Sequence, residues 1–355
     1  AVSTAALNLT SADLNNIGAG FTSVVIGAAT PTTTARGDVA VDIGSGQTVT
    51  VGSDLTVYGE QIGFASGTLA SAASKNITID ALDKLSAVAS AGDGAAVASG
   101  GDLTLRYRAV GTSDHLTFAR ALTGTNVNLL QQDAGDLVLM EKVSGIASLS
   151  GTDLANLQAN ATSGTLTIGG SGSYPATAGN SPVLTISGAA GGAALTSTQV
   201  ASNLVLDFNR IELNNDLTLA VAKTLTLRSQ AGVSQASGKT MSAANLLLSG
   251  SGNVGLGAGN VVSSLAANST GDIALGVTAA PLTIGTVAGV SGIVNAKAIS
   301  VTGAQSIAID QSVLTSGNVT LAGGVGLTAG DGANGITIAS AARVASSGGN
   351  VILDA

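Results

Sequence analysis

The sequence predicts an all-β protein, a right-handed parallel β-helix of about 13 coils, each of roughly 26 residues with three short strands. Three observations predict this fold. Short apolar-x-apolar triplets recur along the 355 residues, and they return at a nearly constant interval. The chain also has 49 glycines but only four Phe, three Tyr and no Trp, which suits a narrow interior bounded by sharp corners.

The triplets give the strands and the interval gives the coil. One series begins at residues 217, 246, 273, 299, 325 and 351, and a second at 225, 254, 282, 307 and 336. Alternation with period two is the signal of a strand, and two series at one period predict two strands per coil. A less regular apolar site around Val233, Val290 and Val313 supplies the third strand. The first half repeats more loosely, through Val24, Val49, Ile77, Leu103 and Val127.

A longer duplication accompanies the coil period. The segment LTSADLNNI at 9–17 resembles LSGTDLANL at 149–157, with an offset of 140 residues. Its Thr/Ser-x-x-Asp start predicts one capped helical turn before a strand, and the alternative is a corner without helix. No linker interrupts the composition, so we expect one continuous β-helix over 1–355 with duplicated parts 1–148 and 149–355.

Composition excludes several classes of protein. Thirteen Lys and Arg against 21 Asp and Glu give a net charge of −8, which excludes a basic nucleic-acid binder. The absence of cysteine excludes a disulfide scaffold, a thiol enzyme and a zinc site of the cysteine type. The sequence contains no run of about 18 apolar residues, so it predicts no membrane-spanning helix. The first residues lack the features of a signal peptide, so we expect a mature product or a cut segment of something longer.

Three segments carry a resemblance to a known family. They are SADLNNIGAGFTSVVIG at 11–27, NLLLSGSGNVGLGAGN at 245–260 and the stretch 316–355. They resemble the repeats of filamentous-haemagglutinin-like exoproteins, which bacteria export by two-partner secretion and use in adhesion. The resemblance implies an extracellular or cell-surface shaft segment. The Asn-Pro-Asn motifs of that family's secretion domain do not occur here, and autotransporter passengers and filament subunits have a similar composition.

Two groups of residues are candidates for a binding or catalytic site. Arg36, Gly37 and Asp38 form an RGD tripeptide before an apolar triplet, where a corner would expose it to an integrin; the alternative is a chance match. Asp207, Arg210, Glu212 and Asp216 form the richest charged region, with Asp207–Arg210 expected at a corner and Glu212 pointing outward. Such carboxylates suit a polysaccharide lyase or glycosidase, but a solvated cluster of ion pairs is the alternative we favour.

The remaining polar motifs predict no metal, cofactor or catalytic residue. Asp93-Gly94, Asp331-Gly332 and Gly100-Gly101-Asp102 resemble parts of calcium repeats, but they are not iterated, so we interpret them as turns. The single histidine, His115, is expected at the surface. Three arginines near it could form a small basic patch for an anionic glycan, but a solvated face is the alternative we favour; they are Arg106, Arg108 and Arg120.

We therefore expect a non-enzymatic, extracellular structural or adhesive rod without cofactors. The last triplet, Val351-Ile352-Leu353, has no polar cap after it, which favours end-to-end self-association or continuation in a longer chain. A host receptor or glycan is the other expected partner. The alternatives are a self-assembling filament subunit, a β-helix enzyme acting on polysaccharides, and an ice-binding solenoid. The last needs an unbroken threonine face, which this chain interrupts with Ala, Ser and Gly.

Overall fold

A computed structural model describes residues 7–17, 20–28, 36–107, 116–132, 135–142, 146–170, 183–188, 194–278, 280–324 and 335–355. The protein is all-β, with 58% of residues in strands and 3% in helices. The chain divides into two compact units, Ala1–Asn180 with Thr198–Asn203 and Ser181–Ser197 with Leu204–Ala355. The predicted single domain over 1–355, with duplicated parts 1–148 and 149–355, stays a prediction.

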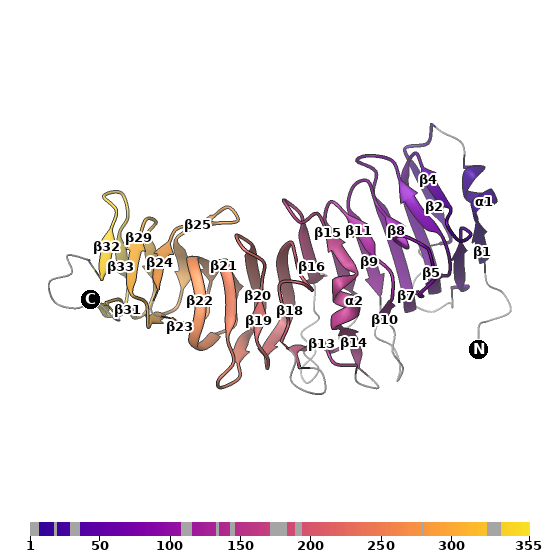
Figure 1. Cartoon of the computed structure of the whole chain (residues 1–355). Coiled ribbons are helices and arrows are strands. Elements are labelled where there is room, and N and C mark those ends of the chain that lie inside the picture. Colours follow the sequence, from indigo (N-terminus) through magenta and orange to yellow (C-terminus); the bar gives the residue numbers. More distant parts are fainter. Residues whose placement is uncertain are drawn as a thin grey trace. The chain divides into compact units, whose positions relative to one another are not determined.

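In unit 1, short strands lie side by side and two helical turns interrupt them (Figure 1). The elements are β1 (Leu7–Thr10), α1 (Ser11–Asn15), β2 (Ser23–Ile26), β3 (Val39–Asp42), β4 (Thr48–Val51), β5 (Asp54–Phe64), β6 (Thr68–Ser71), β7 (Ile77–Ala87), β8 (Val97–Ala98), β9 (Leu103–Tyr107), β10 (Leu116–Phe118), β11 (Leu122–Gly124), β12 (Val127–Gln131), β13 (Leu137–Met140), β14 (Ala147–Ser150), α2 (Gly151–Ala155), β15 (Leu157–Ala159) and β16 (Thr165–Gly169).

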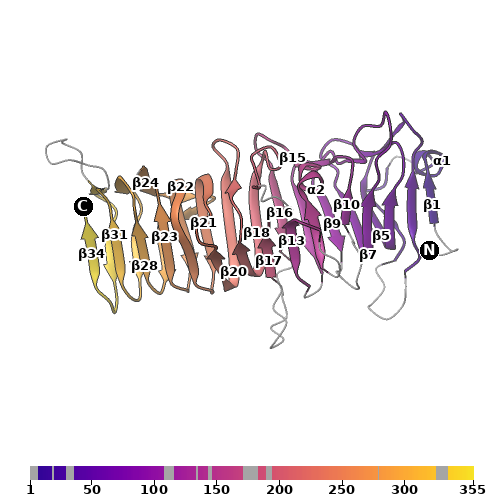
Figure 2. The same cartoon turned by 60° about the horizontal axis from the view of Figure 1, so that its bottom comes forward.

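The regular elements in the described residues of unit 2 are all strands, which Figure 2 shows in a second view. They are β17 (Val183–Ile186), β18 (Asn203–Leu213), β19 (Leu217–Thr218), β20 (Thr224–Gln235), β21 (Met241–Gly250), β22 (Val254–Ser269), β23 (Ile273–Val277), β24 (Pro281–Ile284), β25 (Thr286–Val287), β26 (Val290–Ser291), β27 (Ile293–Ala296), β28 (Ile299–Thr302), β29 (Ser306–Ile309), β30 (Val313–Thr315), β31 (Val319–Ala322), β32 (Ile336–Ile338), β33 (Val344–Ser346) and β34 (Val351–Asp354).

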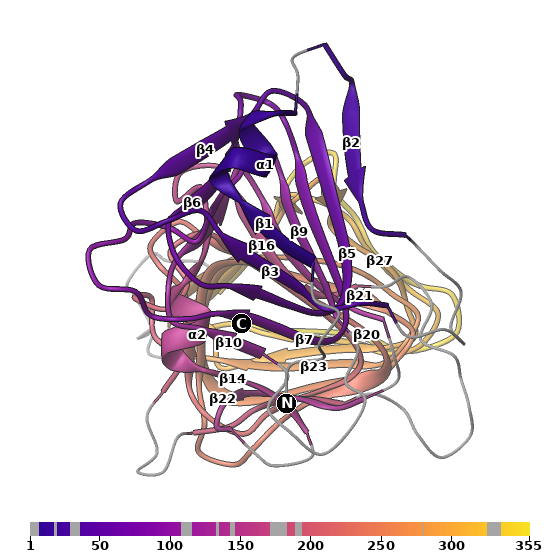
Figure 3. The same ribbon diagram turned by 90° about the vertical axis from the view of Figure 1, so that its right-hand side faces the viewer.

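Parallel pairing joins most strands of unit 1 into three ladders, seen end-on in Figure 3, and joins β13 with β14. Each ladder stacks apolar residues from successive strands in register, and nearly all of these side chains are buried. The columns are Leu7–Val39–Ile62–Leu85–Leu116, Val49–Leu69–Val97–Leu122–Leu157 and Val24–Leu55–Ile77–Leu103–Val127–Leu166. Parallel pairing of this kind gives the core a continuous apolar interior.

The strands of unit 2 pair in the same parallel manner, except for the short antiparallel hairpin of β25 and β26. One ladder runs from β17 to β34 and a second from β18 to β32. Their columns are Leu184–Ile211–Val233–Val254–Ile273–Ile299–Val319–Val351 and Leu204–Leu225–Leu246–Leu265–Ile284–Ile309–Ile338. A third column joins Ala267, Ile293, Val313 and Val344.

The predicted interval is correct in some places and wrong in others. Ile273 pairs with Ile299, 26 residues later, and Leu282 pairs with Ile307, as the triplets predict. Leu217, however, pairs with Met241 and not with Leu246. The constant period fails between residues 204 and 273. In that region the column residues of two ladders pair with residues only 19 to 22 positions later, and Leu217 pairs with a residue 24 positions later.

The corner predicted at 207–210 is a β-bulge inside a long strand, and a similar bulge occurs in β5, so the prediction of uniformly short strands is wrong for these two strands. β5 shifts register between Gly59 and Gln61, and β18 shifts between Phe208 and Arg210. The segment predicted as a corner at 207–210 therefore bends without leaving the strand. At a sharper bend, Gly250 has φ 113° and a side chain there would overlap the carbonyl oxygen of Ser229, so only glycine fits.

The predicted helical turns are confirmed at both copies of the duplication. In α1 the Thr10 side chain accepts the Asp13 N–H while the Asp13 carboxylate accepts the Thr10 N–H. Ser150 and Asp153 form the same capping box in α2. Within the described residues, neither turn nor any other helix has the length and apolar content needed to cross a membrane.

Candidate functional site

The two charged side chains of the RGD tripeptide are largely buried, so their expected exposure is wrong, although Gly37 between them is exposed. The Arg36 side chain is 9% exposed, and its guanidinium donates to the Asp80 carboxylate at 2.8 Å and lies 5.0 Å from the centre of the Tyr58 ring. Its backbone N–H donates to Glu60 at 3.2 Å, and Asp38 is 7% exposed. Side chains from the strands that follow in the sequence cover the Arg36 side chain.

Asp80 is the centre of this polar cluster. Besides Arg36, its carboxylate accepts a hydrogen bond from Gln132 at 3.1 Å and lies 3.8 Å from the half-exposed Arg106 guanidinium. Asp80 is directly opposite Tyr58 on one side and Arg106 on the other in the third ladder of unit 1. The buried carboxylate of Asp80 binds donors from several different segments of the chain and so holds these segments together.

The predicted charged cluster of unit 2 is two surface ion pairs and one corner contact. Asp207 and Arg228 stand opposite each other in β18 and β20, with 2.9 Å between their charged atoms. Arg210 and Glu212 lie 2.6 Å apart, with the arginine half exposed. Asp216 joins neither pair; its carboxylate accepts the backbone N–H of Thr240 at 2.7 Å. The structure thus does not gather the four residues into one cluster.

Burial distinguishes Asp207 from the rest of this cluster. Desolvation raises the pKa of the Asp207 carboxyl above its ordinary value, and the opposing charge and hydrogen bond of Arg228 offset that rise in part. The guanidinium of Arg228 is half exposed, so its charge compensates only in part for the water that the Asp207 carboxylate loses.

A column of Asn and Asp side chains runs along one corner of unit 1, and the sequence alone did not reveal it. Each side-chain oxygen accepts the backbone N–H of the next member of the column, 22 to 39 residues later in the chain. The bonds join Asp54 to Asn76 at 2.9 Å, Asn76 to Asp102 at 2.8 Å, Asp102 to Asn126 at 3.3 Å, and Asn126 to Thr165 at 3.0 Å. The column satisfies corner N–H groups between the ladders.

In unit 2 a fully buried asparagine performs the same task more completely. Asn260 is 0% exposed, and its amide group donates to the carbonyl oxygens of Gly257 at 2.6 Å and Gly276 at 2.9 Å. Its side-chain oxygen accepts the Met241 N–H and the Gln235 amide, both at 2.8 Å. Sequence patterning gave no signal for this residue, because its partners lie in three different turns of the chain.

Asp93, considered above for calcium, is paired with a guanidinium. Its carboxylate lies 2.9 Å from Arg120, and both side chains are buried, at 0% and 5% exposure. It also accepts the backbone N–H groups of Gly46 at 2.6 Å and Gly67 at 2.9 Å. Hydrogen bonds from Ser90 and from these two N–H groups lower the pKa of the Asp93 carboxyl well below its usual range. Asp93 therefore ties three corner loops together.

Asp102 and the arginines complete the account of the minor candidates. The Asp102 carboxylate accepts the Asn126 amide at 2.9 Å. No group of three or more acidic, His or Cys residues within the described ranges is placed to bind a metal ion. Arg106 and Arg120 belong to separate ion pairs, so the expected basic patch is wrong for these two. The described residues do not include Arg108, His115 and the pair Asp331-Gly332.

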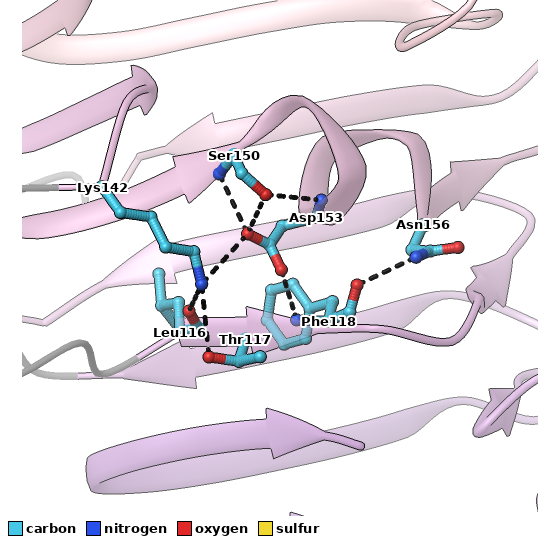
Figure 4. A network of polar contacts seen from close by, with 7 residues as sticks. All are labelled: Leu116, Thr117, Phe118, Lys142, Ser150, Asp153 and Asn156. Carbon is cyan, nitrogen blue, oxygen red and sulfur yellow. Dashed lines mark hydrogen bonds and ion pairs between the residues drawn. The ribbon is translucent and has the colours of Figure 1, made fainter. Parts of the chain in front are cut away.

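Side chains of α2 replace a missing strand beside β10 (Figure 4). The Asp153 carboxylate accepts the Phe118 N–H at 2.6 Å, and the Asn156 amide donates to the Phe118 carbonyl oxygen at 2.9 Å. Lys142 lies 3.5 Å from the same carboxylate and 3.4 Å from the Leu116 carbonyl oxygen. Asp153 is 3% exposed, so one residue of an edge strand receives its donor and acceptor from a helical turn.

The equivalent turn α1 carries the same residues in a different setting. Asp13 and Asn16 stand 140 positions before Asp153 and Asn156, and both are exposed. Within the described part of the chain, Asp13 bonds only to Thr10, and no bond to the Asn16 side chain occurs. β1 pairs with β3 on one side and with no other described strand.

The strands at the edges of the ladders expose apolar side chains. Leu7 of β1 is 46% exposed, whereas its duplicate Ala147 is 1% exposed. Val351 and Leu353 of β34 are each 42% exposed, although the residues opposite them in β31 are fully buried. These edges combine unpaired backbone groups with uncovered apolar surface, which is the usual character of a surface that binds another strand.

Comparison with known proteins adds no relative. The chain matches no protein family, no curated protein and no solved structure.

Proposed function

We propose that this chain is a non-enzymatic segment of an extracellular bacterial fibre, built as a right-handed parallel β-helix. In this proposal successive coils rest on one another through in-register backbone hydrogen bonds about 4.8 Å apart. Length and stiffness are then the properties that the fold supplies. Adhesion to a host receptor or glycan would be a property of the loops and outward faces that the coils carry.

One observation carries the proposal: apolar columns run through each unit and reach the edge strands uncovered. Val319 is fully buried while Val351, directly opposite it in β34, is 42% exposed. Burial of apolar area is worth about 25 cal/mol per Å², so such an edge gains stability when another coil covers it. A fibre in which coil follows coil provides that cover at every edge but the last.

The use of charge supports a structural role. Asp80, Asp93 and Asp153 are each buried and each bonded to groups from at least two other parts of unit 1. Residues that hold coils together this way are already satisfied by protein partners, whereas catalytic carboxylates need access to a substrate. The resemblance to filamentous-haemagglutinin-like repeats supports the bacterial surface as the location.

Electron microscopy of the purified chain tests the proposal. We expect filaments or end-to-end particles whose length grows with protein concentration, and no release of reducing ends from acidic polysaccharides. A particle of one size at every concentration would contradict the fibre. Turnover of a polysaccharide, abolished by Asp207→Asn and retained by the surface control Asp54→Asn, would favour the enzymatic alternative.

A further inference from the structure

We propose that the β1–α1 edge binds strand β34 of a second copy of this chain, and that Asp13 and Asn16 pair with the backbone of Leu353. The inference deepens the proposed fibre function, and rests on it, by naming the contact between copies. In this contact the partner is an extended strand, and the two side chains of α1 replace the strand that would otherwise continue its pairing.

The duplicate turn α2 supplies the first step. Asp153 and Asn156 bind the N–H and the C=O of Phe118, the last residue of β10. In α1 the same capping box fixes the aspartate: one oxygen of Asp13 bonds to Thr10, as the corresponding oxygen of Asp153 bonds to Ser150. The second oxygen of Asp153 accepts the hydrogen bond from the Phe118 N–H. The second oxygen of Asp13 has no donor within the described residues.

The position of β34 in its coil supplies the second step. β10 belongs to the ladder formed by the strand segments that follow the bulges of β5 and β7. β34 belongs to the ladder formed by the segment that follows the bulge of β18. Within each unit, therefore, β10 and β34 occupy the same place relative to the bulged corner, and neither pairs with a second strand among the described residues.

Backbone direction supplies the third step. The carbonyl oxygens of Asn350 and Asp354 accept N–H groups of β31 and the residue after it, at 2.8 and 2.7 Å. Because alternate residues of a strand direct their polar groups to opposite neighbours, the N–H and C=O of Leu353 point away from β31. Phe118 has this arrangement too: Ala119 donates to β7, while Phe118 faces α2.

Apolar surface and charge favour a copy of the same chain as the occupant. Leu7 beside α1 and Val351 and Leu353 on β34 are each more than two-fifths exposed. Stacking β34 against β1 covers all three. Asp13 also lacks the cation that Lys142 provides for Asp153, and the exposed Arg343, just before β33, has no carboxylate partner within the described residues.

Sedimentation velocity of the full chain over a concentration series tests the contact. Asn16→Ala removes a side chain that makes no bond within the described part of the chain, so we expect an unchanged melting temperature and association about tenfold weaker. Leu353→Pro, which removes the outward N–H, should have the same effect. Asn156→Ala is the matched control: it removes the internal copy of the contact and should lower the melting temperature without weakening association.

Cross-linking then identifies the neighbours. The chain has no cysteine, so Asn16→Cys and Asp354→Cys preparations can be mixed and oxidised without background. We expect a disulfide-linked heterodimer, and none when Asn16→Cys is replaced by Val221→Cys, which is 94% exposed and belongs to neither edge strand. Association that is insensitive to Asn16→Ala and yields no heterodimer would overturn this contact while leaving the fibre function standing. A chain that stays monomeric at every concentration would overturn both.

Discussion

The side chain of Asp153 holds the backbone of Phe118, 35 residues earlier in the chain, through a 2.6 Å hydrogen bond from the N–H to the carboxylate. Asn156 completes the pair by donating to the Phe118 carbonyl oxygen. A strand can therefore stop at α2 without leaving its last donor and acceptor unpaired, because a capped helical turn presents one acceptor and one donor at the required separation.

The first prediction isolates that contact. Asp153→Ala leaves the N-cap Ser150 in place but removes its capping-box partner. It also leaves the buried Phe118 N–H without its acceptor, which costs ~1–3 kcal/mol. Asp13→Ala removes the equivalent capping-box partner from α1 but no bond to a neighbouring strand. Urea denaturation should show the larger loss of unfolding free energy for Asp153→Ala. Equal losses for the two variants would show that the bond to Phe118 contributes nothing.

The second prediction concerns Asn260. Asn260→Leu leaves the buried donors and acceptors around it unsatisfied, and we expect a loss of roughly 3–5 kcal/mol in unfolding free energy. Asn260→Asp should be no better, because a carboxylate cannot donate to the two glycine carbonyl oxygens now bonded to the amide. Asn268→Ala, at an exposed position with one side-chain partner, is the control and should stay within about 1 kcal/mol of wild type.

The third prediction is a pH dependence from Asp93. Hydrogen bonds lower the pKa of this carboxyl in the folded protein. A lowered pKa stabilises the fold above the unfolded value of about 3.9, and that stability is lost as the pH falls through the folded value. Thermal melts between pH 7 and pH 2 should therefore show a steeper decline in wild type than in Asp93→Asn. Parallel curves would contradict the assigned bonding.

The fourth prediction has the opposite sign and concerns Asp207. Burial raises the pKa of its carboxyl, so the folded state takes up a proton before the unfolded state does. Relative to Asp207→Asn, wild type should gain stability as the pH falls through the raised pKa toward about 3.9. Because Arg228 offsets the rise in pKa, the gain of Arg228→Met over Arg228→Met/Asp207→Asn should be larger than that of wild type over Asp207→Asn. A gain that disappears when Arg228 is removed would contradict burial as the cause. Melting temperatures of the four proteins on one pH series distinguish these causes.

Sequence reasoning was most successful where local alternation determines structure. The triplets at Ile273, Ile299 and Leu282 predict strands that the structure contains, because a period of two places apolar residues on one face whatever their partners. The capping residues Thr10 and Ser150 predict helical turns for the same reason: each contact spans three residues.

Sequence reasoning failed where the partner of a residue lies on another strand, far away in the sequence. The burial of Arg36 depends on Asp80, 44 residues later, and the role of Asn260 depends on Gln235 and Met241. To predict such contacts, one must know how many residues separate two paired positions. That number changes wherever a bulge replaces a loop. A constant interval therefore placed Leu246 opposite Leu217, where the structure has Met241.

The corner column of Asp54, Asn76, Asp102 and Asn126 has an evolutionary consequence. Each member performs the same task for its successor, so the segment from Ile77 to Asp102 both starts and finishes at equivalent points of the ladder. Unequal recombination that removes or inserts such a segment joins two equivalent points of the column, so each remaining member still has its acceptor. The gene can thereby gain or lose one segment at a time while the apolar interior keeps its pattern.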